Sequence, residues 1–242
     1  MSMVEDGQSA ASAAAQKTRD ASRGPERYRE WALTALLVGE LLILFAAAPV
    51  AAMGRGAFLL GGYVLALFLV SALVIVSPDI GARILTIVAL ILAATGAAVR
   101  IHHPSVATIW LGHLASIVAL VAISLIIARV VLGPGQVTHH RLQGAVVLYL
   151  NVGVMFTSAF RLILERVPTA FANVPPGQSE AEAFASMLYF SLTTLTTTGY
   201  GDIVPINPIA RGLANLESII GQLYLAILLA RLVTLQIESQ RG

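Results

Sequence analysis

Six consecutive residues near the end of the chain carry backbone groups that could bind a bare cation. They are residues 197–202, TTGYGD in one-letter code. The two glycines on either side of Tyr200 let the backbone adopt conformations that a Cβ atom forbids. A chain extended in that way can turn successive carbonyl oxygens toward one axis, where they replace the water around a dehydrated potassium ion. This stretch therefore predicts ion coordination by carbonyl oxygens rather than catalysis.

The composition of the chain predicts a membrane protein. Hydrophobic residues make up 57% of its 242 residues and charged residues 12%, whereas a soluble domain carries roughly 25% charged residues. The formal net charge of +2 is too small and too scattered to indicate binding to nucleic acid. Cysteine is absent from the sequence, which excludes disulfide bonds and thiolate metal sites.

Six hydrophobic segments are close to the length of about 20 residues that a membrane-spanning helix needs. They cover residues 31–50, 57–77, 84–99, 106–128, 142–160 and 209–235. We therefore predict an all-α membrane protein with six transmembrane helices. The predicted divisions are a disordered tail over 1–30, a four-helix transmembrane domain over 31–132, a pore domain over 141–236 and a short tail over 237–242.

The basic residues predict that both termini are cytoplasmic. With the N-terminus inside, ten Lys and Arg residues fall on the inner side and five on the outer side, as the positive-inside rule expects for a protein of the cell membrane. A cleavable secretory signal is the alternative for the first segment, because Arg27 and Arg29 precede an apolar run that ends in three alanines. The polar stretch before that run, and Glu40 within it, argue against cleavage.

The residues that precede the TTGYGD stretch predict a short helix that enters the membrane without crossing it. Ser179 and Glu182 fit a capping box, in which each side chain bonds the backbone N–H of the other residue, so the helix should begin there and end near Thr196. Re-entrant backbone of this kind is tolerated only where protein or a water-filled cavity surrounds it. The carbonyl end of such a helix carries partial negative charge, which favours a cation.

The run from Ser191 to Pro205 resembles the pore loop and selectivity filter of potassium channels. The last span is similar to the inner helix of prokaryotic members, and the resemblance covers roughly residues 142–235. It implies a passive, potassium-selective channel and no enzymatic activity. Because one loop per chain cannot surround an ion, it also implies a homotetramer in membrane lipid. No cofactor is expected, and K⁺ is the transported ion.

The resemblance assigns roles to individual residues. The predicted ion-binding residues are Thr197, Thr198, Gly199, Tyr200 and Gly201. The predicted supports of the filter are Tyr189, Phe190, Asp202 and Glu217. Tyr189 and Phe190 would form an aromatic cuff with Tyr200, and Asp202 would be anchored to the Tyr189 hydroxyl. Gly221 would be the gating hinge of the inner helix.

One filter residue departs from the pattern of the family. The usual filter has valine at position 198, and this chain has threonine, whose hydroxyl must find a partner where it is buried. Because this side chain should point away from the ions, we expect selectivity to be kept and filter stability or inactivation to change. A less selective monovalent cation channel is the alternative. A non-conducting accessory membrane protein is the alternative from a different class.

The fourth segment distinguishes this chain from voltage-gated channels. Residues 106–128 contain no Arg or Lys, and Arg129 lies only at their end, whereas steep voltage gating takes about 3–4 charges per subunit. Few residues follow Leu235, so we expect no cytoplasmic regulatory module in this chain, and a separate regulatory subunit could supply control. The segments show no internal repeat of the kind that many transporters use.

Two polar residues inside predicted spans call for an explanation. Counting 1.5 Å per residue places both Glu40 and His113 near the middle of the membrane. One interpretation is a structural contact between helices. The other is a proton-sensitive pair, because histidine changes its charge near neutral pH. The adjacent histidines at 102–103 and 139–140 are better explained as interfacial residues than as metal ligands, since no third ligand stands at helical spacing.

Overall fold

The computed structural model describes residues 34–53, 106–132 and 139–241, together with six isolated positions between residues 80 and 95. The predicted tail over 1–30, the second predicted span and most of the third lie outside these described residues. Within the described part, three helices are long and apolar enough to cross a membrane, and their apolar stretches are Gly112–Arg129, Arg141–Arg166 and Pro208–Arg231. Six spans and a separate four-helix domain remain predictions.

The described helices follow the predicted segments closely. Residues 34–52 are helical and include the π-helical turn η1 (Ile43–Ala47) and its continuation α2 (Ala48–Ala52). The three longest helices are α5 (Val106–Leu132), α6 (His139–Arg166) and α8 (Pro208–Arg241). The short elements are α7 (Glu180–Leu195) and the two-residue strands β1 (Phe171–Ala172) and β2 (Val204–Pro205).

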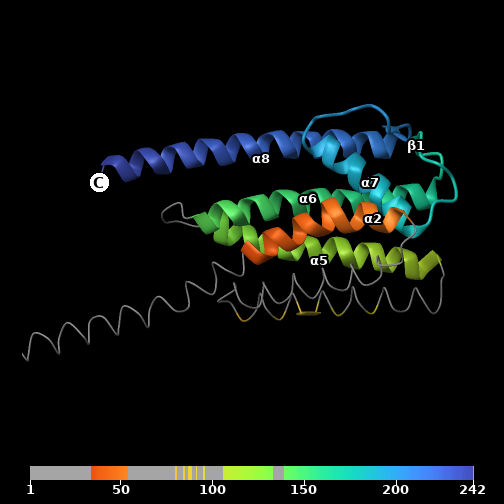
Figure 1. Ribbon diagram of the computed structural model, residues 1–242, viewed down its shortest axis with the longest axis horizontal. Coiled ribbons are helices and arrows are strands. Elements are labelled where there is room, and N and C mark those ends of the chain that lie inside the picture. Colours follow the sequence, from red (N-terminus) through yellow and green to blue (C-terminus); the bar gives the residue numbers. More distant parts are fainter. Residues whose placement is uncertain are drawn as a thin grey trace, which may run out of the picture.

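The long helices run beside one another, and the short helix α7 lies between two of them (Figure 1). In this view α5 packs along α6, the helix over residues 34–52 lies against this pair, and α7 crosses obliquely from α6 toward α8. The part of α8 that approaches the C-terminus extends away from the other described helices. The short helix is therefore enclosed by its own chain, while much of α8 is left uncovered.

Hydrophobic clusters fix α7 on two sides. On one side, Leu44 and Ala48 of the first helix pack with Leu150, Val154 and Leu188, which belong to α6 and α7. On the other side, aromatic rings from α6, α7 and the loop between them meet in T-shaped contacts, with Phe160 and Phe190 centroids 4.9 Å apart. The first helix thus contacts the short helix directly.

The predicted capping box at the start of α7 is confirmed. The Ser179 Oγ accepts a hydrogen bond from the Glu182 N–H at 3.3 Å, and the Glu182 carboxylate accepts one from the Ser179 N–H at 2.7 Å. The helix ends at Leu195, with Thr196 as its C-cap. These two reciprocal bonds explain why a helix begins at this point of a polar loop.

The two short strands tie together the chain segments that enter and leave the α7 region. They pair antiparallel, with Phe171 opposite Pro205 and Ala172 opposite Val204. Beside them, the Ala170 carbonyl accepts hydrogen bonds from the N–H groups of Ile206 at 2.8 Å and Asn207 at 3.1 Å. The loop that contains α7 and the TTGYGD residues is therefore closed at its base.

Candidate functional site: the TTGYGD segment

The TTGYGD backbone alternates between two conformations. Thr197, Gly199 and Gly201 have φ values of 55°, 54° and 77°, whereas the residues between them do not have positive φ. This alternation of handedness lets successive peptide planes face the same way, so that consecutive carbonyls can point to one side. Glycine adopts positive φ readily, but a β-branched residue in that region is an outlier. Thr197 therefore holds conformational strain at the start of the candidate site.

The last turn of α7 anchors the inner end of this segment. The Thr197 N–H donates to the Thr194 carbonyl at 2.9 Å, and the N–H groups of Thr198 and Gly199 donate to the Thr193 carbonyl at 2.8 and 3.2 Å. The final carbonyls of a helix lack partners within the helix. Here they accept from the filter backbone, so the filter begins directly at the negative end of the helix dipole.

The unusual threonine in the filter has a hydrogen-bond partner. The Thr198 Oγ1 lies 2.9 Å from the Thr196 Oγ1, and Thr196 donates onward to the Leu192 carbonyl at 2.7 Å. Because the Thr196 proton goes to that carbonyl, the Thr198 hydroxyl is the donor between the two threonines. The hydroxyl that replaces a valine methyl is thus bonded to the C-terminal end of α7.

The outer end of the filter is held by Tyr189 and Asn173. The rings of Tyr189 and Tyr200 are stacked, with centroids 6.3 Å apart and an interplanar angle of 3°. The hydrogen bond from the Tyr189 hydroxyl lowers the pKa of the Asp202 carboxyl, and the Ile203 N–H, 3.0 Å from Oδ1, adds to this effect. The Asn173 side chain donates to the Asp202 carbonyl at 2.8 Å.

The position of Phe190 corrects the predicted aromatic cuff. Phe190 is buried against Phe160 and Phe171 rather than beside Tyr200. Adjacent residues of a helix project about 100° apart, so Tyr189 and its neighbour cannot both face the filter. Phe190 stabilises the packing of α7 on α6, and Tyr189 alone provides the ring that stacks on Tyr200.

One face of α8 contacts α7 and the start of the TTGYGD segment. Glu217 is fully buried, and its Oε1 lies 2.5 Å from the Ser191 Oγ. The Ser218 hydroxyl donates to the Thr194 carbonyl at 3.2 Å, and the Gln222 amide donates to the Thr197 hydroxyl at 2.7 Å. The predicted hydrogen bond between Glu217 and α7 is therefore present, and the role of Glu217 as a support of a filter remains a prediction.

Gly221 lies on the same face of α8, where the two backbones nearly touch. A Cβ atom at Gly221 would lie 2.0 Å from the Leu195 carbonyl oxygen. That oxygen also accepts a hydrogen bond from the Tyr149 hydroxyl of α6 at 3.1 Å. The absence of a side chain at Gly221 is thus required by packing against the end of α7. A hinge at this residue remains a prediction, and α8 is continuous through it.

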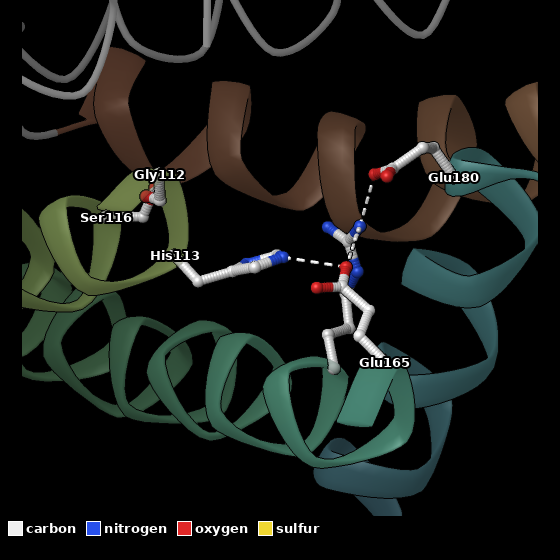
Figure 2. A network of polar contacts seen from close by, with 6 residues as sticks. Gly112, His113, Ser116, Glu165 and Glu180 are labelled. Atoms are coloured by element: carbon white, nitrogen blue, oxygen red, sulfur yellow. Dashed lines mark hydrogen bonds and ion pairs between the residues drawn. The ribbon is translucent and has the colours of Figure 1, made fainter. Parts of the chain in front are cut away.

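A polar network connects α5 to the start of the pore helix (Figure 2). His113 of α5 contacts the Glu165 Oε1 of α6 at 2.9 Å, and the same oxygen lies 3.7 Å from Arg161. Arg161 in turn pairs with Glu180, the first residue of α7. The fourth predicted span is therefore joined to the pore helix by charged and hydrogen-bonding groups.

This network corrects the predicted pairing of Glu40 with His113. His113 faces Glu165, whereas neither carboxylate oxygen of the buried Glu40 has a hydrogen-bond partner within the part of the chain that the structure describes. Depth in the membrane, which suggested the pair, does not determine which face of a helix a residue occupies. The end of α6 also extends beyond the predicted limit of residue 160, which places Glu165 on a helix rather than in a loop.

Several residues of the site were not assigned from the sequence. Ser191 and Gln222 lie in the segments that resemble potassium channels, but the resemblance predicts no role for either. The spacing of Glu217, Ser218, Gly221 and Gln222 places them on one side of a helix, which is a signal that could have identified the polar face of α8. Asn173 carried no such signal, because its contact depends on how the preceding loop folds back.

The comparison with known proteins concerns this same region. Residues 144–237 match a family model described as an ion channel. The matched stretch contains nearly all of α6, the whole of α7 and the filter, and most of α8. That family is an ion-channel family and not a class of enzymes. The match covers the part of the chain in which the site was found.

Two relatives are potassium channels by name. The chain is 34% identical over 80 residues to the inward rectifier potassium channel Kirbac3.1 of Paramagnetospirillum magnetotacticum, covering 33% of this chain and 24% of that protein. It is 32% identical over 74 residues to the potassium voltage-gated channel protein shk-1 of Caenorhabditis elegans, covering 31% of this chain and 14% of that protein. The matches therefore span about a quarter or less of each relative.

Replacing Gly221 by alanine should destabilise the protein. Overpacking a close contact costs typically about 1–3 kcal/mol, and the Leu195 carbonyl cannot move without displacing the start of the filter. Gly212→Ala, on the same helix, is the matched control, because a Cβ at Gly212 would have nothing within 4 Å. Thermal unfolding of the purified protein measures the difference. A melting temperature for Gly221→Ala equal to that of the control would contradict a packing role and favour a pure hinge.

Replacing Tyr189 by phenylalanine should raise the pKa of Asp202. The Tyr189 hydroxyl lowers that pKa in the native protein, so the ionised carboxylate contributes stability above its ordinary pKa, and this is lost as pH falls through the lowered value. Without the hydroxyl, the folded-state pKa of Asp202 moves back toward its ordinary value, so the acid-induced loss of thermal stability that comes from this carboxyl should become smaller. Unfolding curves across acidic pH provide the measurement. Asp202→Asn should remove this pH dependence, and an acid-induced loss in Tyr189→Phe as large as in the wild type would argue against the linkage.

Proposed function

We propose that this chain is the subunit of a homotetrameric, potassium-selective channel of the cell membrane that conducts K⁺ passively. The observation that carries the proposal is the filter backbone, in which left-handed residues alternate at 197, 199 and 201 directly after the C-terminus of a buried helix. Rings of backbone carbonyls that replace the hydration shell are the known basis of potassium conduction. The match of residues 144–237 to an ion-channel family supports the same assignment.

Assembly of four copies is supported by what a single chain leaves exposed. Tyr200 is 71% exposed, and large apolar residues along α8 are about half exposed. The latter include Leu216, Ile219, Leu223 and Ile227. In the proposed tetramer, four filters would surround one ion path, and the uncovered part of α8 would contact lipid or neighbouring subunits. Both termini would be cytoplasmic.

The proposed channel does not sense voltage through its fourth predicted span. Arg129 is in the last turn of α5, and the rest of that helix has no Arg or Lys. Moving one charge through 100 mV is worth about 2.3 kcal/mol, so a helix without charges along its length gains almost nothing from the membrane field. Control by protons, lipid or a separate subunit is compatible with this proposal.

Reconstituted protein should carry a potassium flux that depends on the filter glycines. Gly199→Ala should abolish the flux, because Gly199 has a φ of 54°, which is unfavourable for alanine. Gly177→Ala is the matched control: Gly177 has a φ of 74° and, like Gly199, has nothing within 4 Å of a new Cβ, but it lies outside the filter. Flux into vesicles under a potassium gradient is the measurement. Wild-type protein without flux would overturn the proposal and favour a non-conducting accessory protein.

Replacing Thr198 by valine should keep potassium selectivity and change inactivation or filter stability. The reason is that the Thr198 hydroxyl bonds Thr196 rather than standing among the filter carbonyls. Reversal potentials in mixed potassium and sodium, together with the time course of current, provide the two measurements. A wild-type reversal potential that fails to follow potassium would instead support the less selective cation channel. Identical inactivation in both proteins would remove the role given to this hydroxyl.

A further inference from the structure

The Gln222 side chain reaches the residue at which the filter begins. Gln222 is exposed on α8, and its Nε2 donates to the Thr197 Oγ1 at 2.7 Å, across 25 positions of the sequence. Thr197 is the strained, β-branched residue with a φ of 55°. The Gln222 side chain thus meets the first filter residue, which has both a hydroxyl and a carbonyl.

This hydrogen bond restricts what the Thr197 hydroxyl can do. A hydroxyl oxygen has one proton and two acceptor lone pairs. Because Gln222 donates to one lone pair, the other remains available for a cation, and rotation of the hydroxyl about χ1 would break the bond. The Gln222 amide therefore selects one orientation of an oxygen that the proposed function places at the innermost ion site.

The neighbouring glycine accounts for the reach of Gln222. The backbone of α8 can approach Leu195 so closely only because Gly221 has no Cβ, since that atom would lie 2.0 Å from the Leu195 carbonyl oxygen. Ser218, one turn earlier, bonds the Thr194 carbonyl at 3.2 Å. These two contacts fix the distance and rotation of α8 at the level of the filter. A glutamine side chain is then long enough to span the gap to Thr197.

We propose that Gln222 is a positioning residue for ion discrimination: its amide orients the Thr197 hydroxyl, and so sets the geometry of the innermost ion site. The inference rests on the proposed channel function and goes beyond it by naming a determinant of selectivity outside the TTGYGD stretch. Selectivity depends on the number and field strength of the oxygens around the ion. A hydroxyl that is free to rotate would provide a less uniform set of four ligands.

The test compares ion discrimination in reconstituted Gln222→Met and Gln222→Leu with the wild type. Both variants remove the amide donor and introduce an apolar side chain of similar reach or bulk. We expect the permeability ratio of potassium to sodium, measured from reversal potentials, to fall by at least about fivefold, the factor that one hydrogen bond typically contributes. Gln143→Met is the matched control, because the side-chain hydrogen bond of Gln143 is with Thr34 and not with a TTGYGD residue, and its permeability ratio should not change.

A double variant separates positioning from a general structural role. In a Thr197→Val background the hydroxyl is absent, so Gln222→Met should cause no further fall in the ratio. Wild-type protein that conducts, with an unchanged ratio in both Gln222 variants, would overturn this inference alone. Loss of folding in both variants would also overturn it, because orienting one hydroxyl does not require the whole fold. Wild-type protein without any flux would instead overturn the proposed function.

Discussion

Most of the described structure can be understood as support for a backbone that cannot support itself. In the proposed filter, carbonyls that point to one axis would be unavailable for hydrogen bonds within their own segment. The left-handed φ of Thr197 is unfavourable for a β-branched residue. Strained conformations of this kind cost about 1–3 kcal/mol and persist only where the surroundings determine them. Both ends of the filter are accordingly bonded to residues outside it.

The support consists of many weak contacts rather than one strong contact. Four side-chain hydrogen bonds connect α6, α7 and α8 at the level of the filter: Ser191 with Glu217, Ser218 with Thr194, Tyr149 with Leu195, and Gln222 with Thr197. Hydrogen bonds between membrane helices average about 0.6 kcal/mol. Four of them together contribute about 2.4 kcal/mol, which is comparable with the strain at a single residue. Loss of any one bond would therefore weaken the site without removing it.

The sequence predicted the elements of the site better than the contacts between them. Apolar length predicted α5, α6 and α8, and the capping residues Ser179 and Glu182 predicted the start of α7, because these are local properties of the chain. The partner of His113 depends on how helices rotate against one another, and counting residues along a span carries no information on rotation. For the same reason, the resemblance groups the neighbours Tyr189 and Phe190, although their side chains project about 100° apart on α7.

The polar face of α8 lies between these two cases. Its helical spacing is visible in the sequence, but the partners of Glu217 and Gln222 are set by the close approach at Gly221. That approach can be recognised only from the positions of two backbones. Local chemistry is thus readable from the chain, and contacts that depend on the distance between elements are not.

The closed base of the loop has a consequence for how the chain can vary in length. The Ala170 carbonyl and the β1–β2 pair join the two ends of the segment that contains α7 and the TTGYGD residues. Residues inserted within this segment must therefore be accommodated within it. Between β1 and the cap of α7 the chain contains exposed proline and glycine residues, and extra residues there would bulge outward at little entropic cost. Between α7 and β2 the chain must cover a fixed distance, because both of these elements are held in place. The chain between β1 and α7 can therefore vary in length, whereas an insertion or deletion between α7 and β2 would displace the TTGYGD residues.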